Sequence, residues 1–212
     1  MQIEGRYRIL LIRHGKTEGN RERRYNGCRT DEVLCPEGRE ELLQRRLPGD
    51  GADHIFSGPM KRCRETAACL YPGRAPEILP EMKEVDFGRF EGKNHQELDG
   101  DPEYQAWIDS GGRTGFPEGE GAEEFTDRSM RAFRDMLHRL PKDTEEVVSA
   151  ALVCHGGNIM AIMSSLTGGN FFDFQAKNGE GYELTFSMRG EDIYDLSYHS
   201  LYSGESSGSD HR

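Results

Sequence analysis

The chain has 212 residues, of which 34% are hydrophobic and 31% charged, and its formal net charge at pH 7 is −11. This length suits one compact domain, and the modest apolar content confines the core to a few short segments. Because no Lys/Arg-rich stripe offsets the negative charge, nucleic acids and anionic membranes are disfavoured as partners.

The first third of the chain alternates predicted strands with predicted helices. Residues 7–12 are an apolar run without polar alternation, which is typical of a central strand covered on both faces. Residues 36–47 carry leucines at helical spacing among charges and predict a surface helix. Residues 54–57 predict a short strand, and Pro59 favours the first turn of a helix that ends near Tyr71.

Residues 79–121 differ from the rest in being rich in glycine, proline and acidic side chains. Within this segment, residues 94–98 and 102–108 predict short helical pieces. A segment of this composition suits an excursion over a site better than a place in the core.

The remainder of the chain returns to regular elements. Residues 133–140 place Phe and Leu/Met side chains at the i, i+3, i+4, i+7 spacing of a long helix. Residues 147–153 predict an apolar strand, and residues 156–166 predict a helix. Residues 182–187 and 193–198 alternate and predict paired edge strands.

Strands that alternate with helices predict an α/β fold, here a three-layer α/β/α sandwich with a mainly parallel central sheet and a small excursion covering the site. We expect residues 1–202 to form this single domain and residues 203–212, which are polar and rich in Gly and Ser, to form a flexible tail. Ligands of such sheets bind beyond the carboxyl ends of the strands. Residues at these ends are therefore the first candidates for function.

Three strand ends carry cationic or imidazole side chains. Arg13 and His14 follow the first strand, His155 follows a later strand, and Arg62 lies on the first turns of the helix after the second strand. A guanidinium at the end of a buried strand is costly to desolvate unless an anion meets it. Glycines beside both histidines, such as Gly156, let the backbone approach a ligand, and helix N-termini add N–H donors. Together these ends predict a phosphate pocket.

Four motifs resemble those of the histidine phosphatase superfamily, also called phosphoglycerate mutase-like. They occur in the family's order at residues 11–20 (LIRHGKTEGN), 57–67 (SGPMKRCRETA), 84–92 (EVDFGRFEG) and 153–157 (VCHGG). The resemblance implies a phosphomonoesterase that acts on a small phosphorylated metabolite through a phosphohistidine intermediate.

The resemblance implies that His14 is transiently phosphorylated. It also implies that Arg13, Arg62 and His155 hold the phosphoryl oxygens and that Asn20 lines the same pocket. Fixed cations stabilise the charge that spreads over the equatorial oxygens in the transition state. Neighbouring arginines also depress the histidine pKa and keep the ring neutral and nucleophilic. No metal and no cofactor are then expected.

Glu84 is the proton donor that the resemblance implies. An alkoxide is a poor leaving group, so a carboxylic acid must protonate it, and the resulting carboxylate can then activate water. Glu81, Asp86 and Glu91 are neighbours in the sequence and remain alternatives for this role.

Features after the proposed acid favour hydrolysis over isomerisation. Family mutases have a Tyr-Gly pair and a longer insertion here, whereas this chain has Asp86-Phe87-Gly88 and a compact excursion. With Trp107, the segment looks most like the alpha-ribazole phosphatase branch, which acts in cobalamin assembly, although Phe90 departs from that branch's pattern. The alternatives are a cofactor-dependent phosphoglycerate mutase and a non-catalytic phosphate-binding module.

The remaining expectations concern surroundings and partners. The five cysteines are an odd set without metal-ligand spacing and predict reduced thiols. No apolar run is long enough for a signal-peptide core or a membrane span. We therefore expect a cytoplasmic enzyme whose partner is a small phosphorylated metabolite, and the sequence leaves a homodimer open.

Overall fold

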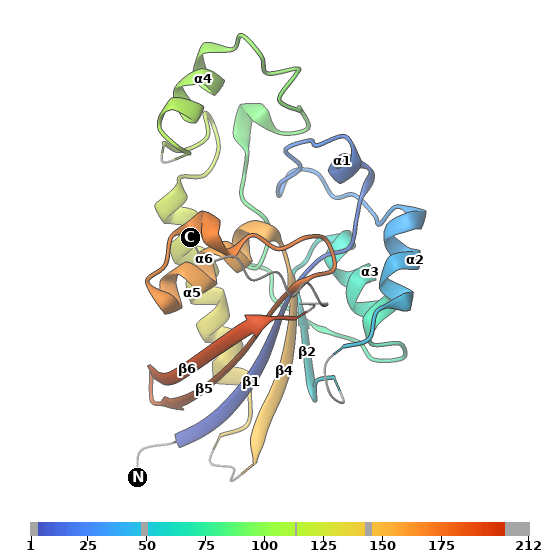
Figure 1. Ribbon diagram of the computed structural model, residues 1–212, viewed down its shortest axis with the longest axis vertical. Helices are drawn as coiled ribbons and strands as arrows, with labels where there is room; N and C mark the ends of the chain where they lie inside the picture. Colours follow the sequence, from blue (N-terminus) through green and yellow to red (C-terminus); the bar gives the residue numbers. More distant parts are fainter. Residues whose placement is uncertain (1–3, 48–50, 113, 143–145, 202–212) are drawn as a thin grey trace, which may run out of the picture.

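The computed structural model describes residues 4–47, 51–112, 114–142 and 146–201. A six-stranded sheet of order β3-β2-β4-β1-β5-β6 forms its centre (Figure 1). The strands are β1 (Glu4–Arg13), β2 (His54–Ser57), β3 (Glu77–Ile78), β4 (Val147–Cys154), β5 (Gly181–Arg189) and β6 (Asp192–Ser200). The helices are α1 (Glu18–Arg21), α2 (Pro36–Gln44), α3 (Lys61–Leu70), α4 (Pro102–Asp109), α5 (Ala122–Arg139) and α6 (Gly156–Thr167), with the 3₁₀ helices η1 (Gly88–Phe90) and η2 (Phe171–Phe174). Within the described ranges, no helix combines the length and the apolar character needed to cross a bilayer.

The apolar run of β1 is buried on both faces of the sheet. Ile9 and Leu11 point into one core, which α5 and α6 complete, whereas Leu10 and Ile12 point into a second core, which α3 completes. Figure 1 shows α5 and α6 on one side of the sheet and α2 with α3 on the other. Continuous apolar sequence is what a strand covered on both faces requires.

The predicted α/β sandwich with a mainly parallel sheet is confirmed. β3, β2, β4 and β1 run parallel, and β5 and β6 are antiparallel. The single domain at residues 1–202 stays a prediction, and the predicted tail at residues 203–212 lies outside the described residues.

Three predicted details are wrong. Residues 94–98 form turns. The Asn94 side chain caps one turn, which the hydrogen bond from Leu98 N–H to the Asn94 carbonyl closes, but the bonds that follow close tighter turns and the chain changes direction at Gly100, whose φ is +79°. α2 ends at Gln44, since Arg45 adopts an extended conformation. β5 and β6 pair as predicted, but only β6 is an edge strand: β5 lies between β1 and β6, because alternation shows that one face is buried but not whether a strand has a second neighbour.

The predicted excursion rises beyond the carboxyl ends of β1 and β4 and carries α4 near its tip (Figure 1). Its two stems are joined by backbone hydrogen bonds of 2.9 Å, from Arg89 N–H to the Pro117 carbonyl and from Glu120 N–H to the Asp86 carbonyl. Gly88 lies where the stems cross, with a φ of +54°, and a Cβ there would stand 2.0 Å from the Pro117 oxygen. Only glycine fits this position.

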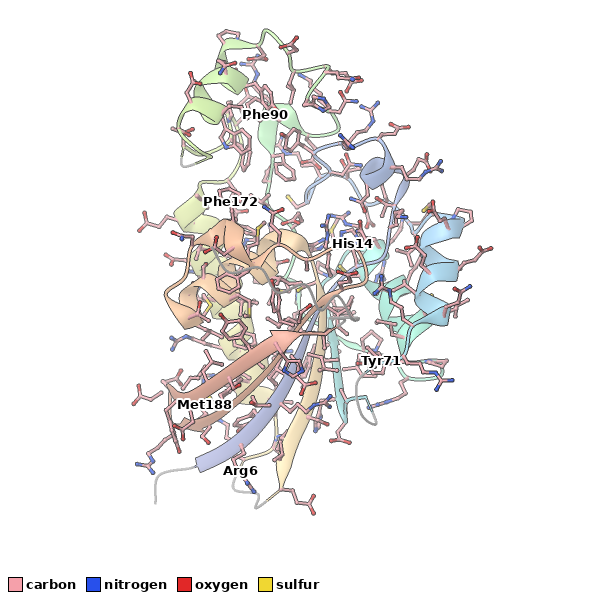
Figure 2. All side chains as sticks on the ribbon, viewed as in Figure 1. Arg6, His14, Tyr71, Phe90, Phe172 and Met188 are labelled. Carbon is pink, nitrogen blue, oxygen red and sulfur yellow. The ribbon has the colours of Figure 1, made fainter. Side chains whose placement is uncertain are left out.

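The excursion contains a small aromatic core, which we call the aromatic wall. Phe90, labelled near the top of Figure 2, is fully buried in it. Tyr25 reaches in from the loop after α1, and its hydroxyl lies 3.0 Å from that of Tyr104. The aromatic wall consists of rings whose contacting centroids lie 4.9–6.3 Å apart: Tyr25, Phe87, Phe90, Tyr104, Trp107 and Phe116.

Candidate active site

Strand register places His14 and His155 side by side. β1 and β4 pair in parallel with Arg13 opposite Cys154, so each histidine is the next residue along its chain. The His14 backbone N–H donates to the Cys154 carbonyl at 2.9 Å, and the two ring centroids are 5.2 Å apart. Both residues are buried. Figure 2 shows His14 at the carboxyl end of the sheet, below the excursion.

The surroundings of His14 fix its protonation. Nδ1 lies 2.8 Å from the Gly15 carbonyl oxygen. Because a carbonyl can only accept a hydrogen bond, Nδ1 carries the proton and the lone pair is on Nε2. Burial, followed by the charges of Arg62 and Arg13, holds the pKa of His14 well below its usual range. The ring is therefore neutral near pH 7 and suited to nucleophilic attack through Nε2.

Arg62 is a buried cation held by neutral groups. It lies on α3, and only 1% of its surface is exposed. Its Nη1 donates to the Thr30 carbonyl at 2.7 Å, its Nη2 to the Gly27 carbonyl at 3.0 Å, and its Nε to Nδ1 of His155 at 3.3 Å. Within the described part of the chain it forms no salt bridge with a carboxylate. Its charge remains available to an anion.

Arg13 and the N-terminus of α6 face the same space. Nη1 of Arg13 donates to the Ala176 carbonyl at 2.8 Å, whereas its Nε is buried and has no hydrogen-bond partner among the described residues. A buried donor without a partner costs about 1–3 kcal/mol, so this N–H suits an anionic acceptor. A Cβ on Gly156 would stand 3.4 Å from that Nε, which places the first turn of α6 beside the guanidinium. The helix N-terminus adds N–H donors for the same anion.

Glu84 reaches this space from the first stem of the excursion. Its Oε1 accepts from Val85 N–H at 2.9 Å, and its Oε2 accepts from Gly157 N–H at 3.4 Å. Burial raises the pKa of Glu84, although these hydrogen bonds and the charges of Arg62 and Arg13 oppose the shift. A Cβ on Gly157 would stand 2.4 Å from Oε1, so the carboxyl group takes the room that glycine leaves.

The other three candidate acids are directed elsewhere. Glu81 is exposed. Asp86 forms a salt bridge of 2.7 Å with Arg29, and Glu91 accepts a hydrogen bond from Gly27 N–H at 2.8 Å. Unlike Glu84, none of the three lines the cavity described below.

Asn20 lies behind His14 rather than in the cavity. Its Oδ1 accepts from Thr17 N–H at 3.1 Å and from Nδ2 of Asn178 at 2.9 Å. Nδ2 of Asn178 also donates to the His14 carbonyl at 3.1 Å. These contacts fix the backbone around His14, and the predicted role of Asn20 in phosphate binding stays a prediction.

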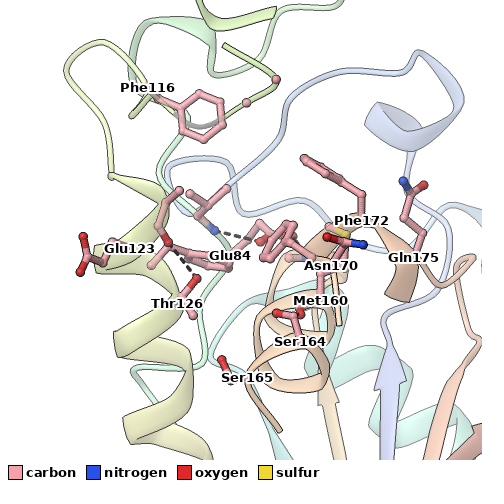
Figure 3. Close-up of a pocket in the computed structure, with 18 of the residues that line it drawn as sticks. Glu84, Phe116, Glu123, Thr126, Met160, Ser164, Ser165, Asn170, Phe172 and Gln175 are labelled. Atoms are coloured by element: carbon pink, nitrogen blue, oxygen red, sulfur yellow. Dashed lines mark hydrogen bonds between the residues drawn. The ribbon is translucent and has the colours of Figure 1, made fainter. Parts of the chain in front are cut away.

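A cavity of about 1180 Å³ lies above this cluster. Arg13, Glu84 and Gly156 line its base, whereas His14, the residue after Arg13, is buried and is not among the residues that line the cavity. Figure 3 shows Phe116 of the excursion on one side, with Met160 and Ser164 of α6 on the opposite side. Its aromatic lining comprises Tyr25, Phe87, Trp107, Phe116, Phe125, Phe171 and Phe172. This volume exceeds what a phosphoryl group needs and leaves room for a leaving group.

Metal ligands do not gather in the described parts of the chain. There, no group of three or more His, Cys, Asp or Glu side chains is arranged to hold a metal ion. That catalysis needs no metal and no cofactor stays a prediction.

Sequence reasoning missed the polar residues that support the site. Thr66, one helical turn after Arg62, accepts a hydrogen bond from Gly15 N–H at 2.8 Å. Sγ of Cys63 lies 3.4 Å from Nε2 of His155. Thr66 and Cys63 lie within the second motif, so their position was the signal that could have found them. Asn178 lies in a loop without a motif.

Comparisons with known proteins agree with this geometry. The chain matches the histidine phosphatase superfamily (branch 1) over residues 9–197. The probable phosphoglycerate mutase GpmB of Escherichia fergusonii is 30% identical over 166 residues, which are 76% of this chain and 74% of that protein. The four sequence motifs make up only a small part of these aligned residues.

Two solved structures have the same fold. An alpha-ribazole phosphatase from Shigella flexneri superposes with a TM-score of 0.75 at 24% identity, covering 92% of this chain and 96% of the other. A phosphoserine phosphatase mutant from Entamoeba histolytica, in complex with phosphoserine, gives a TM-score of 0.68 at 26% identity and covers 89% and 97%. The predicted family and enzyme class, a histidine phosphatase, are confirmed: the chain belongs to the histidine phosphatase superfamily.

Proposed function

We propose that this protein hydrolyses a phosphomonoester of a small metabolite through a phosphohistidine on His14. The observation that carries the proposal is a neutral, buried imidazole whose Nε2 holds the lone pair, beside two arginines without carboxylate partners in the described structure. A nucleophile and uncompensated cations in one place suit attack on a phosphoryl group.

In the first half-reaction, Nε2 of His14 attacks phosphorus as the bond to the leaving oxygen breaks. Glu84, in its acid form, gives its proton to that oxygen and becomes a carboxylate. Arg13, Arg62 and the N–H groups at the start of α6 stabilise the charge on the equatorial oxygens. Removal of one such donor from an oxyanion hole raises the barrier by about 3–4 kcal/mol.

In the second half-reaction, the Glu84 carboxylate takes a proton from water while the water oxygen attacks phosphorus. The bond from phosphorus to Nε2 breaks, phosphate forms, and the lone pair returns to His14. Glu84 is again the acid, so one carboxyl group serves both steps. Its raised pKa favours the acid form with which the cycle starts.

We further propose a leaving group that is largely aromatic. Seven aromatic side chains line the cavity, whereas Arg13 is the one cation among the described residues that line it. Alpha-ribazole phosphate carries a fused aromatic ring and has this character. The name of the Shigella flexneri structure supports it as a candidate.

Phosphate release tests both parts of this proposal. We expect kcat/KM for alpha-ribazole phosphate to exceed that for glycerol 2-phosphate by about 10-fold or more, as apolar contacts worth about 1.4 kcal/mol would give. Equal values would remove the aromatic leaving group. We expect His14→Ala to lower kcat on the order of 10⁴-fold or more. A variant as active as wild type would overturn the phosphohistidine, and loss of activity with chelator that a divalent ion restores would overturn metal-free catalysis.

A second candidate is a phosphoglycerate mutase, which the name of the Escherichia fergusonii relative favours. A phosphoglycerate carries a carboxylate, for which the cavity lining offers little positive charge. We expect no isomerisation of 3-phosphoglycerate in the presence of a diphosphorylated primer. A non-catalytic phosphate-binding module would need neither a nucleophile such as His14 nor an acid such as Glu84.

A further inference from the structure

A buried ion pair lies outside the residues assigned so far. Arg128 of α5 is 5% exposed, and Glu120, at the end of the excursion, is 9% exposed. The pair is bidentate, with Nε to Oε1 at 2.8 Å and Nη2 to Oε2 at 2.7 Å. A buried pair of this kind often stabilises a fold no more than apolar side chains would. Its other contacts suggest what it does.

Those contacts converge on the segment that presents Glu84. Nη1 of Arg128 donates to the carbonyl oxygens of Glu81 and Lys83, the latter at 3.1 Å, and Nη2 donates to the carbonyl of Glu84 at 3.4 Å. Three carbonyl groups within four residues therefore share one guanidinium. The donors in its planar fork fix both the position and the direction of this backbone.

Glu120 holds the same segment from its other end. Its backbone N–H donates to the Asp86 carbonyl at 2.9 Å, and its Oε2 accepts from Asp86 N–H at 3.4 Å. The segment from residue 81 to residue 86 is thus bound on both sides of Glu84. Neither Arg128 nor Glu120 binds the carboxyl group of Glu84, which lines the cavity.

Asn158 links this segment to the phosphate side of the site. Its Nδ2 donates to the Lys83 carbonyl at 3.2 Å and to Oγ of Ser129 at 3.0 Å. Its Oδ1 accepts from the backbone N–H of His155 at 3.3 Å. Residues 128 and 129 of α5 therefore set the Glu84 segment relative to the N-terminus of α6.

We infer that Arg128 and Glu120 are positioning residues that hold Glu84 where it can exchange a proton with the leaving group and with water. The inference rests on the proposed function. It implies a specific defect when the pair is broken: phosphate binding and attack by His14 persist, whereas proton transfer fails. A general loss of folding would harm all substrates alike.

Leaving groups of different basicity separate these two effects. The alkoxide of glycerol 2-phosphate must be protonated, whereas 4-nitrophenolate departs without a proton. Because kcat/KM covers only the steps through release of the alcohol, it isolates the first half-reaction. We expect Arg128→Met to lower kcat/KM for glycerol 2-phosphate on the order of 10²-fold, the usual contribution of general acid catalysis. For 4-nitrophenyl phosphate we expect a fall of less than about 3-fold, since no acid is needed there.

The second half-reaction gives an independent readout. Water activation also needs Glu84, so we expect Arg128→Met to release one equivalent of 4-nitrophenol in a burst and then to turn over slowly. Arg128→Lys keeps the charge without the fork and should recover part of the lost activity. Glu120→Gln keeps the shape of the side chain and should show the same substrate dependence with smaller losses. It replaces Arg128→Met as the test variant if Arg128→Met does not fold.

Arg139→Met is the matched control. Arg139 is the last residue of α5 and also pairs with a carboxylate, that of Glu77, but this pair is exposed. We expect wild-type values for both substrates. Equal losses on both substrates in Arg128→Met and Glu120→Gln, or no loss in either, would overturn the inference while leaving the proposed function intact. Wild-type protein that hydrolyses neither ester would instead overturn the proposed function.

Discussion

The base of the cavity and the aromatic wall are built in different ways. At the base, strand pairing and the starts of α3 and α6 bring buried polar groups together, so their positions follow from the sheet. The aromatic wall is made of loops and short helices, and its shape depends on rings packed against one another. By our proposal, the base of the cavity performs the reaction, whereas the aromatic wall selects the leaving group. Changes at the base should affect every substrate, and changes in the wall should affect substrate preference.

The largest effect of a change at the base beyond His14 is expected at Arg62. Arg62→Met removes a buried cation that, by our proposal, stabilises the phosphoryl group, so kcat/KM should fall on the order of 10³-fold for alkyl and aryl phosphates alike. The carbonyls of Thr30 and Gly27 also lose their partner, which should lower the free energy of unfolding by about 1–3 kcal/mol. Steady-state kinetics and urea unfolding measure the two effects. A loss restricted to one class of substrate would contradict the assignment of Arg62 to the base.

Glu84→Gln should lower kcat/KM for alkyl phosphates on the order of 10²-fold. By our proposal the acid form of Glu84 donates the proton, so wild-type kcat/KM should fall as pH rises through the pKa of Glu84. Burial raises that pKa, which moves the fall to higher pH than for an exposed carboxyl group. A pH profile of the variant should lack this alkaline limb. If the limb persisted, another acid such as Glu81, Asp86 or Glu91 would be the donor.

Trp107→Ala should change substrate preference rather than the chemical steps of the reaction. The indole lines the cavity, and its Nε1 is buried without a hydrogen-bond partner among the described residues. We expect kcat/KM for alpha-ribazole phosphate to fall by about 10-fold, and that for glycerol 2-phosphate by less than about 2-fold. Ile108→Ala, at the exposed neighbouring position of α4, is the control and should leave both values unchanged. Equal losses on the two substrates would assign Trp107 to the folding of the excursion alone.

The smallest effect concerns stability against pH. Burial, then nearby charges, lowers the pKa values of His14 and His155 well below 6.5, so the folded state binds fewer protons there than the unfolded state. The stability that the neutral rings contribute is full above pH 6.5 and is lost as pH falls from there through the folded pKa values. His155→Asn should flatten this dependence in thermal unfolding. A wild-type stability that does not change below pH 6.5 would contradict the burial of neutral histidines.

Much of the base could be predicted from the sequence, because the signals are local. An apolar run followed by Arg13 and His14 marks the end of a buried strand, and the same pattern recurs before His155. Parallel strands then place these ends together without any knowledge of distances. Only the family resemblance favours Glu84 over Glu81 as the proton donor, since both are acidic residues in one polar segment.

The other parts of the site could not be predicted, because they depend on contacts between residues far apart in the sequence. Asn178 meets His14 only because the loop before β5 returns to the end of β1. In the sequence, Arg128 is indistinguishable from other charged residues of a surface helix. Its role becomes visible only in the fold, where Glu120 of the excursion pairs with it. The turns after Asn94 show a local limit, since tight turns and the left-handed conformation of Gly100 end the segment after one helical turn.

Trapping of the phosphoenzyme is the decisive test of a phosphohistidine on His14. Wild-type protein and His14→Ala would be mixed with a radiolabelled phosphomonoester, quenched within one turnover, and digested to locate the label. We predict an acid-labile, base-stable label on the peptide that contains His14, and no label on the variant. Label on another residue, or a variant that is labelled and turns over like wild type, would contradict this prediction.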